Sequence, residues 1–471
     1  MTTPDTASNY WVDSAGDAES WPPATGRHEA DVVIVGAGFT GLWTAYYLAE
    51  QRPDLEIAVL EGETVGHGAS GRNGGWVIGN LAGLDRLIGD LALPERRALC
   101  AQLADNVDQI GRITEREAID AEFHKGGTLD AAARYPEQVA IQKAHRAALI
   151  ELGHAADDCL WLDGPALAER AAFRNGYGAL FFRHTATVHP MKLVRGLARA
   201  VERRGVTIHE HSRVRYVAPH QVITTNGAQF SARHIVQATE GYSESLAGLG
   251  QRVLSVRSLV IATEPLADNV WARVGLLARP TFCDASRVIN YGHRSRDGRL
   301  VFGARGAYPL GGAPKHDHAI TPADIEMRRR LLLDLCPGLP EDVAVSHGWG
   351  GSLGLSRRFR PHAIVDSKTG LATAGGYAGE GVAASHLMAR TTAELIAGED
   401  TPRTRAPWAH SDVAAEALLK RWEPEPIRWL AAQTISACYG AEESLLRRGH
   451  GDNRFARAVM RANDRFAAII E

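Results

Sequence analysis

The stretch DVVIVGAGFTG, residues 31–41, determines the fold of the first part of the chain. Its apolar residues predict a buried strand, its glycines predict a tight turn, and the apolar-periodic residues 42–48 predict a helix. A second apolar run, residues 57–60, ends in Glu61, about 20 residues after the last glycine. This strand–turn–helix–strand unit with its distal acid is the fingerprint of a dinucleotide-binding fold.

Each glycine of the fingerprint has a physical role. Gly36 permits the tight turn, Gly38 lets backbone N–H groups approach a pyrophosphate, and Gly41 lets the helix pack closely against the strand. The N-terminus of the helix adds partial positive charge for the phosphates. Glu61 can accept hydrogen bonds from the ribose hydroxyls, and because its charge would repel a 2′-phosphate, NADP is disfavoured. A glycine turn without any ligand is the alternative. The cofactor-binding candidates in this unit are Gly36, Gly38, Phe39, Thr40, Gly41 and Glu61.

The composition is that of an ordinary globular protein with more than one domain. A length of 471 residues exceeds what one hydrophobic core usually holds, so two domains are expected. The net charge of −3 argues against nucleic acid or an anionic membrane as the main partner. No apolar run is long enough to predict a membrane-spanning helix. The five cysteines lack CxxC spacing, which argues against a metal site and suits a reducing cytoplasm.

The order of the expected elements indicates a discontinuous nucleotide-binding domain. Apolar runs near residues 31, 206, 234 and 371 are typical of parallel strands, and patterns typical of antiparallel strands lie between them. The predicted fold is a Rossmann-like α/β domain with an inserted α+β substrate domain built on an antiparallel sheet, followed by a helical tail. The predicted ranges are 28–118, 176–250 and 345–400 for the nucleotide-binding domain, 119–175 and 251–344 for the substrate domain, and 401–471 for the tail. Residues 1–27 are interpreted as an N-terminal arm, and residues 123–129 as a strand.

The loop GHGASGRNGG, residues 66–75, resembles a signature of the D-amino acid oxidase (DAO) superfamily of flavoenzymes. Further matches to this family are Val214, the turn at 238–242, the segment 349–351, GGYAGEGV at 375–382 and the tail at 422–430. Together they cover about residues 28 to 430. Within the superfamily, the chain is similar to the gamma-glutamylputrescine oxidoreductase and glycine/sarcosine oxidase-like branch.

The resemblance implies FAD as the cofactor. Gly74 and Gly75 would let the chain pass close to the flavin ring, and Ser70 and Arg72 would serve phosphates or ribityl hydroxyls. The loop around residues 379–381 would present backbone N–H groups to the ring. A surface ion pair for Arg72 and a plain glycine turn at 379–381 are the alternatives. The cofactor-binding candidates from the resemblance are Ser70, Arg72, Asn73, Gly74, Gly75, Val214, Thr239, Gly376, Gly379, Gly381 and Val382.

Candidate substrate residues flank the expected flavin site. The residues assigned to catalysis are Asn73, Tyr291, Arg257 and His347, and the weaker candidates are His67, Trp76, His293 and Arg360. Arg257 lies on an apolar strand, where burying an unpaired charge would cost free energy. It could bind a substrate carboxylate with a bidentate contact, or it could pair with a nearby acid. For every member of this set, an ordinary structural role is the alternative.

Departures from the family pattern narrow the chemistry. Residues 352–361 lack the cysteine through which sarcosine oxidases of this fold attach FAD, so non-covalent FAD is expected. Residues 300–303 lack the lysine that promotes reaction with oxygen in those enzymes, so the resemblance leaves an electron carrier open beside oxygen as the acceptor. No second dinucleotide motif is present, and the electrons are therefore expected to come from the substrate.

Three functions remain open on this basis. The first is FAD-dependent oxidation of an amine or amino acid, with hydride transfer to the flavin and hydrolysis of the resulting imine. The second is an FAD-dependent dehydrogenase of a hydroxy acid or polyol phosphate. The third is a non-catalytic flavin-binding subunit of a complex.

Overall fold

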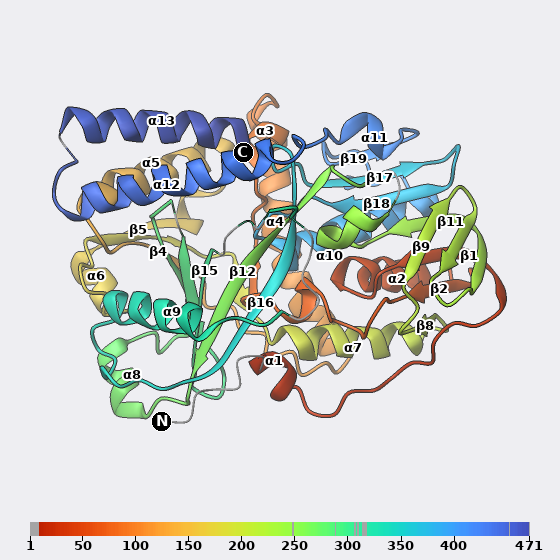
Figure 1. Cartoon of the computed structure of the whole chain (residues 1–471), viewed down its shortest axis with the longest axis horizontal. Helices are drawn as coiled ribbons and strands as arrows, with labels where there is room; N and C mark the ends of the chain where they lie inside the picture. The colour runs from red at the N-terminus through yellow and green to blue at the C-terminus, as the bar shows by residue number, and fades with distance from the viewer. Residues whose placement is uncertain are drawn as a thin grey trace.

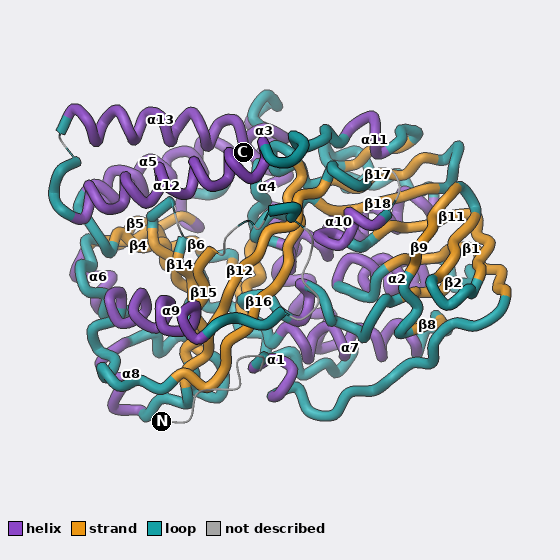
Figure 2. The backbone as a smooth tube through the Cα atoms, viewed as in Figure 1, coloured by secondary structure: helices purple, strands orange, loops and turns teal. Residues whose placement is uncertain are grey.

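The computed structural model describes residues 9–246, 249–287, 289–305, 308, 310–312, 318–451 and 453–470. Two large β-sheets lie next to each other in the view of Figure 1, and helices cover their faces. Figure 2 shows the strands gathered into these two groups, with most helices on the outside. The described helices include none long and apolar enough to cross a lipid bilayer.

The first βαβ unit forms as the sequence predicts. It consists of β1 (Arg27–Val35), α2 (Phe39–Gln51) and β2 (Ile57–Leu60), and the two strands pair in parallel. Gly36 adopts φ +107°, a conformation that side chains other than glycine rarely take. A Cβ on Gly41 would overlap the carbonyl oxygen of Gly36, which confirms the close packing of helix against strand.

A nine-stranded sheet is built around this unit. Its main path runs β19-β17-β18-β11-β1-β2-β8, and from β18 to β8 all neighbours are parallel. The antiparallel strands β9 and β10 extend from β11. The added strands are β8 (Thr207–His209), β9 (Val214–Ala218), β10 (Gln221–Thr224), β11 (Gln229–Gln237), β17 (His362–Asp366), β18 (Leu371–Gly375) and β19 (Ala409–Ser411).

An eight-stranded sheet forms the second half of the molecule. Its order is β16-β12-β15-β14-β13-β4-β6-β5, and every pair is antiparallel except β4 with β13. Its strands are β4 (Thr128–Ala132), β5 (Cys159–Asp163), β6 (Gly178–Phe182), β12 (Val253–Thr263), β13 (Thr281–Asp284), β14 (Asn290–Arg294), β15 (Leu300–Arg305) and β16 (Val345–Ser356). A small third sheet pairs β3 (Trp76–Ile78) with β7 (Thr185–Thr187).

Side-chain caps mark the start of two of the longer helices. His189 caps α7, where its Nδ1 accepts the Lys192 N–H at 3.2 Å, and Thr321 forms a capping box with Asp324 at the start of α9. The helices are α1 (Tyr10–Asp13), α3 (Leu84–Ile88), α4 (Leu93–Arg116), α5 (Glu137–Leu152), α6 (Gly164–Ala168), α7 (Pro190–Glu202), α8 (Asp268–Val274), α9 (Pro322–Leu335), α10 (Gly381–Ala397), α11 (Ala415–Leu418), α12 (Ile427–Arg447) and α13 (Arg454–Ile470), with short 3₁₀ turns η1 (Ala69–Gly71), η2 (Ala156–Asp158) and η3 (Glu240–Ser245).

Sheet membership differs from the predicted ranges at three strands. The predicted nucleotide-binding segments 176–250 and 345–400 begin with β6 and β16, but both strands belong to the eight-stranded sheet. Conversely, β19 of the predicted tail joins the nine-stranded sheet beside β17. The reason is long-range pairing: β16 pairs with β12 along almost its whole length, which no local pattern records. The division into two domains stays a proposal with these strands reassigned.

The C-terminal helices α12 and α13 pack against each other above the eight-stranded sheet (Figure 1). Ion pairs fasten them there. Arg134, which follows β4, bonds Glu443 at 2.8 Å, and Arg287, which follows β13, bonds Glu442 at 2.8 Å. The tail is therefore helical as predicted, and it forms part of the body of the molecule.

Candidate active site

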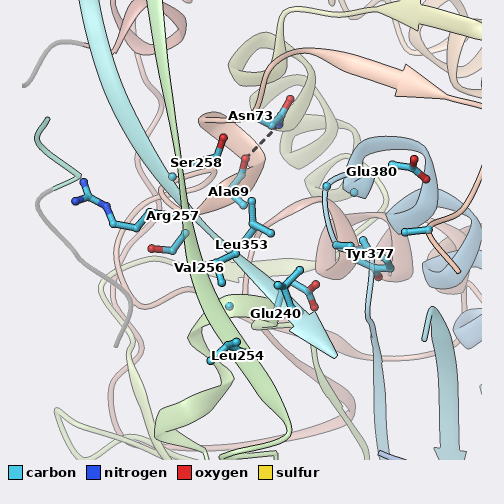
Figure 3. A pocket seen from close by; sticks show the side chains of 18 of the residues that line it. Ala69, Asn73, Glu240, Leu254, Val256, Arg257, Ser258, Leu353, Tyr377 and Glu380 are labelled. Atoms are coloured by element: carbon cyan, nitrogen blue, oxygen red, sulfur yellow. Dashed lines mark hydrogen bonds between the residues drawn. The ribbon is translucent and has the colours of Figure 1, made fainter. Parts of the chain in front are cut away.

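A pocket of about 1600 Å³ extends from the fingerprint to the eight-stranded sheet and the C-terminal tail. Figure 3 shows part of it, with residues of β12 on one side and the segment before α10 on the other. The predicted residues that line it are Gly36, Gly38, Phe39, Thr40, Glu61, His67, Ser70, Arg72, Asn73, Gly74, Trp76, Val214, Thr239, Arg257, Tyr291, Gly379, Gly381 and Val382. The structure thus brings together most of a set that is scattered along the sequence.

Glu61 is held at one end of this pocket by backbone groups. Its Oε2 accepts the Ala37 N–H at 2.8 Å, and its Oε1 accepts the Glu63 N–H at 3.0 Å. Burial raises the pKa of this carboxyl. The side chain is therefore a fixed acceptor at the end of β2, beside the glycine turn. Its predicted contact with ribose hydroxyls fits this position.

The loop at 66–75 is attached to the N-terminus of α2. Ser70 Oγ accepts the Phe39 N–H at 2.8 Å, and a Cβ added to Gly38 would lie 2.8 Å from the same oxygen. Arg72 donates from Nε to the His67 carbonyl at 2.7 Å. Within the described residues, no carboxylate oxygen lies within 4.0 Å of the Arg72 guanidinium. Burial lowers its pKa, and a shielded cation without an anionic partner suits a phosphate better than the surface ion pair considered above.

Asn73 uses its side chain to hold this loop in shape. Its Nδ2 donates to the carbonyls of Ala69 at 3.2 Å and Ser70 at 2.9 Å, the first of which is drawn in Figure 3. Its Oδ1 accepts the Gly75 N–H at 2.8 Å. Since the polar atoms of Asn73 are engaged within the loop, its position favours a positioning role over the predicted catalytic one.

The N-terminal arm supports the same loop from behind. Trp11 donates from Nε1 to the Asn73 carbonyl at 2.8 Å, and Asn9 donates from Nδ2 to the Gly71 carbonyl at 3.0 Å. Trp11 is only 1% exposed. The arm is therefore part of the framework of the site, a role that its polar composition does not indicate.

The segment before α10 is fixed by a buried carboxylate that sequence reasoning did not assign. Glu240 accepts the N–H groups of Gly376 and Tyr377, and burial raises its pKa to about 7. The Tyr377 hydroxyl in turn bonds Thr40 Oγ1 at 3.0 Å, which ties the segment to α2. A Cβ on Gly379 would meet no atom within 4 Å, so this glycine faces open space, as close approach of a ring requires.

Tyr291 and Arg257 come from adjacent parts of the eight-stranded sheet. The Tyr291 hydroxyl bonds Ser258 Oγ at 2.9 Å, and its ring packs edge-on to Trp76. A Cβ on Gly74 would clash with the Tyr291 ring, so the loop and the strand meet here. Arg257 donates from Nη2 to the Ala319 carbonyl at 2.8 Å, and within the described residues it has no carboxylate within 4.0 Å. The ion-pair alternative for Arg257 is therefore not supported.

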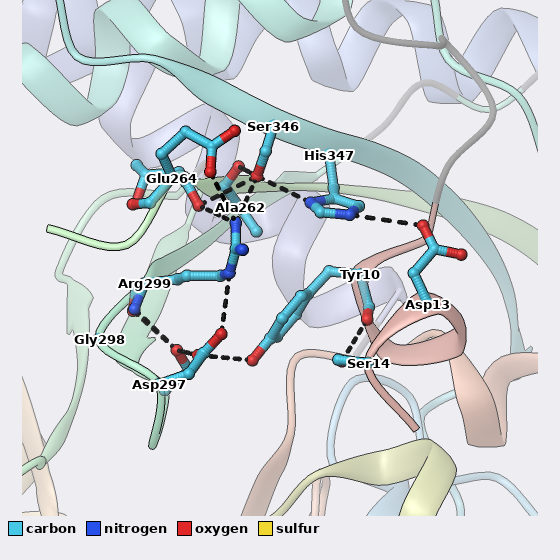
Figure 4. A network of polar contacts seen from close by, with 12 residues as sticks. Tyr10, Asp13, Ser14, Ala262, Glu264, Asp297, Gly298, Arg299, Ser346 and His347 are labelled. Carbon is cyan, nitrogen blue, oxygen red and sulfur yellow. Dashed lines mark hydrogen bonds and ion pairs between the residues drawn. The ribbon is translucent and has the colours of Figure 1, made fainter. Parts of the chain in front are cut away.

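His347 is placed away from the pocket, so the structure does not support its predicted catalytic role. It is not among the described residues that line the pocket. Its Nδ1 bonds Ser346 Oγ at 2.8 Å, and its Nε2 lies 3.4 Å from a carboxylate oxygen of Asp13 in the arm (Figure 4). The same network includes Tyr10, whose hydroxyl donates to Asp297 at 2.7 Å. His347 lies near the start of β16, where the arm meets the sheet.

Five other predicted residues also lie off the pocket wall. The described lining does not include Gly41, Gly75, Gly376, His293 or Arg360. Gly41 and Gly75 are needed for backbone packing, because a Cβ would meet Gly36 O in one case and Val188 O in the other. Gly376 has φ +81°, and its N–H is used by Glu240. These glycines shape the site without facing it.

The part of the pocket next to β4 contains four polar residues that were not predicted: Asp130, His145, Cys283 and Glu380. His145 Nδ1 lies 3.4 Å from Asp130 Oδ2, and Gln142 also bonds Asp130. Only Glu380 has a recognisable signal in the sequence, because it is an acid within the glycine-rich segment GGYAGEGV. The other three lie in segments with no recognisable motif.

Fold and pocket together indicate a dinucleotide-binding protein in which a second sheet lies across the pocket from the glycine turn. A family model described as FAD dependent oxidoreductase (DAO) matches residues 31–395. The chain belongs to this family, which confirms the resemblance seen in the loop at 66–75 and in the segment at 375–382. FAD is accordingly the cofactor of the family, and the pocket size, the fixed Glu61 and the unpaired Arg72 fit it.

Individual relatives agree with this assignment. A probable oxidoreductase OrdL of Haemophilus influenzae is 30% identical over 405 residues, covering 83% of this chain and 88% of the relative. The gamma-glutamylputrescine oxidoreductase of Escherichia coli is 27% identical over 402 residues, covering 83% and 89%. The crystal structure of a glycine oxidase from Geobacillus kaustophilus has a TM-score of 0.64 at 22% identity, covering 84% of this chain and 100% of that one, which confirms the fold.

Proposed function

We propose that this protein oxidises an amine or amino acid at the carbon next to nitrogen, using FAD. The observation that carries the proposal is one continuous pocket that joins the fingerprint to the eight-stranded sheet. Relatives of similar length include a gamma-glutamylputrescine oxidoreductase, and proteins of the same fold include glycine oxidases. These names support an amine or amino acid as the substrate class.

Some residues of the pocket would hold the cofactor, and others would position the substrate. Glu61 would accept the ribose hydroxyls, while Ser70, Arg72 and the N-terminus of α2 would hold the pyrophosphate. Tyr291 and Gly74 bound the space for the ring from the opposite side. Bound FAD supplies the acceptor for the hydride, and water hydrolyses the imine that the substrate becomes.

The protein contributes orientation and exclusion of water more than acid–base chemistry. The N-terminus of α10, at Gly381, directs its partial positive charge toward the pocket, where it would favour the anionic reduced cofactor. Helix α12 covers the pocket on the substrate side with residues such as Ile435 and Tyr439. Arg257 is proposed to hold a substrate carboxylate, because the residue lines the pocket and has no ion-pair partner among the described residues.

The proposal also covers how FAD is attached, what reoxidises it and where the protein is located. FAD is held without a covalent bond, since residues 352–361 contain no cysteine. Oxygen or an electron carrier reoxidises it. Cytoplasmic localisation is proposed on the five cysteines, all of which are free thiols in the structure.

Anaerobic reduction of the bound flavin tests this function. The purified yellow protein is mixed without oxygen with a panel of amines, amino acids, hydroxy acids and polyol phosphates, and flavin absorbance is followed. Bleaching by amines with release of ammonia or a smaller amine is expected. Bleaching only by hydroxy acids or polyol phosphates would establish the dehydrogenase alternative. No bleaching, together with co-purification of a stable partner, would establish the non-catalytic alternative.

A further inference from the structure

The four polar residues beside β4 form a cluster in which two carboxyl groups face one imidazole and one thiol. Asp130 and Cys283 sit opposite each other in the parallel pair β4–β13, and the Cys283 thiol also bonds Asp130. His145 reaches Asp130 from α5, with Nδ1 3.4 Å from Oδ2. Glu380 faces this group from the segment before α10, close enough for His145 and Glu380 to affect each other's pKa. Three packed elements and one loop thus direct two carboxylates, one imidazole and one thiol at the same part of the pocket.

Glu380 is the incompletely satisfied member of this cluster. Its carboxylate accepts the Ala82 N–H, but its Oε2 is shielded from solvent and has no hydrogen-bond partner among the described residues. No arginine or lysine nitrogen of the described residues lies within 4.0 Å of Glu380 or Asp130. Buried carboxylates are costly unless a cation or enough donors compensate them. Burial accordingly raises the pKa of Glu380 to about 7.

Apolar side chains surround the cluster on the same part of the pocket wall. Leu149, Leu180 and Phe182 belong to one hydrophobic group and line the pocket, and Ile78 packs against them. A ligand that fits here needs a cationic group for the carboxylates and hydrocarbon for this wall.

We propose that Glu380 and Asp130 form a subsite for the ammonium group of an aliphatic amine, an assignment that rests on the proposed amine-oxidising function. His145 is a positioning residue in this subsite, because it contacts Asp130. The subsite lies apart from Arg257, which would bind a carboxylate. The pocket thereby selects substrates by positive charge as well as by shape.

Binding of matched ligands without turnover tests the subsite. The FAD-loaded full chain is titrated with tert-butylammonium, tert-butanol and pivalate, and flavin absorbance and calorimetry report binding. These compounds have similar shape but different charge, and none has a hydrogen on the carbon that would be oxidised. The wild-type protein should bind tert-butylammonium in preference to the other two.

Substitutions test whether Glu380 and Asp130 cause the preference for tert-butylammonium. Glu380→Gln and Asp130→Asn should each weaken tert-butylammonium binding about tenfold while leaving tert-butanol binding unchanged. Glu423→Gln is the matched control, because Glu423 also lines the pocket but pairs with Arg357. FAD content and melting temperature show that each variant is folded, and Asp130→Asn carries the test if Glu380→Gln does not fold. Unchanged ammonium affinity in the folded variants, or equal loss for all three ligands, would overturn the subsite.

The subsite and the proposed oxidation of amines can be tested independently of each other. If amines bleach the flavin but these variants bind tert-butylammonium like the wild type, only the subsite is wrong. If charge-selective binding is present and depends on Glu380 while no amine bleaches the flavin, the subsite stands and the oxidation of amines is wrong.

Discussion

The two ends of the pocket are built in opposite ways. The cofactor end is made within one short segment, where Gly36, Gly41 and Glu61 belong to a single βαβ unit and backbone N–H groups fix the acid. The substrate end is assembled from side chains of β4, α5, β13 and the segment before α10, which are far apart in the chain. Local backbone geometry therefore determines the first end, and side chains brought together by the fold determine the second.

The largest effect should come from breaking the cofactor end at its most crowded point. In Gly41→Ala, the added methyl group overlaps the carbonyl oxygen of Gly36, and α2 must move away from β1. A loss of about 3 kcal/mol or more in the free energy of unfolding is expected, with little FAD retained. Thermal melting and flavin content of the purified protein measure this. Gly440→Ala, where the methyl meets nothing within 4 Å, is the control and should be neutral. Normal flavin content in Gly41→Ala would show that the turn is not the cofactor site.

Arg257 tests whether the second sheet recognises substrate charge. Arg257→Met should raise KM for a carboxylate-bearing substrate by an amount equivalent to about 2–4 kcal/mol, because a bidentate charged contact is lost. The protein should stay folded and yellow. Steady-state kinetics with an amino acid and with the amine lacking its carboxylate separate the two roles. An unchanged KM with a lower melting temperature would make Arg257 structural.

Glu61→Ala tests the cofactor end through the loss of hydrogen bonds, whereas Gly41→Ala tests it through a steric clash. Glu61→Ala should weaken FAD binding by about 1.5–3 kcal/mol for each charge-assisted hydrogen bond that is lost. Equilibrium binding of FAD to protein stripped of flavin measures the change. Glu63→Ala is a neighbouring control, since Glu63 pairs with the exposed Arg213. Full wild-type affinity in Glu61→Ala would rule out its role at the ribose.

The pH dependence of ligand binding examines the substrate end. Burial raises the pKa of Glu380 to about 7, so its carboxyl is neutral below pH 7 and charged above it, while an alkylammonium stays charged throughout. The hydrogen bond to Asp130 raises the pKa of His145, which loses its positive charge in the same direction. The Cys283 thiol stays neutral because burial raises its pKa well above the usual value.

Affinity for tert-butylammonium should therefore increase about tenfold from pH 6 to pH 8, as the Glu380 carboxylate becomes ionised. The dependence should be much weaker in Glu380→Gln. Calorimetric titrations at pH 6, 7 and 8 measure it. A flat or falling affinity in the wild-type protein would be incompatible with an ionising carboxylate at this position.

The smallest effect is expected at His347. His347→Ala removes contacts to Ser346 and Asp13 and leaves the pocket wall unchanged, so kcat should stay within about twofold of the wild type. A cost of about 1 kcal/mol or less in stability is expected, because the partner Asp13 is exposed. Kinetics and thermal melting are compared side by side. A large fall in kcat with normal stability would return His347 to the catalytic set.

Much of the fold and of the cofactor end was predictable because their causes are local. The apolar run before Gly36, the helix after the turn and the spacing to Glu61 each depend on neighbouring residues. The spacing of apolar residues and the residue types that form turns are properties of short segments, so they can be read directly from the sequence. The loop at 66–75 also indicated the protein family, which the comparison with known proteins confirms.

Other features depended on pairing that the sequence does not encode locally. The placement of β16 beside β12, and hence the sheet to which it belongs, follows from contacts between distant segments. The expected strand at 123–129 begins instead at Thr128, where pairing with β6 and β13 starts. His347 had the right residue type for catalysis, but its position on β16 directed it to the arm.

The sequence by itself determined the dinucleotide fold, the cofactor class and most of the predicted residues that line the pocket, because a backbone turn and its flanking strand and helix are specified by consecutive residues. Only the tertiary structure decided the substrate end. Asp130 meets Cys283 through parallel strand pairing, His145 reaches them from a helix, and Glu380 completes the group from the other half of the molecule. Each of these residues is ordinary where it stands in the chain, and their convergence on one part of the pocket appears only after folding.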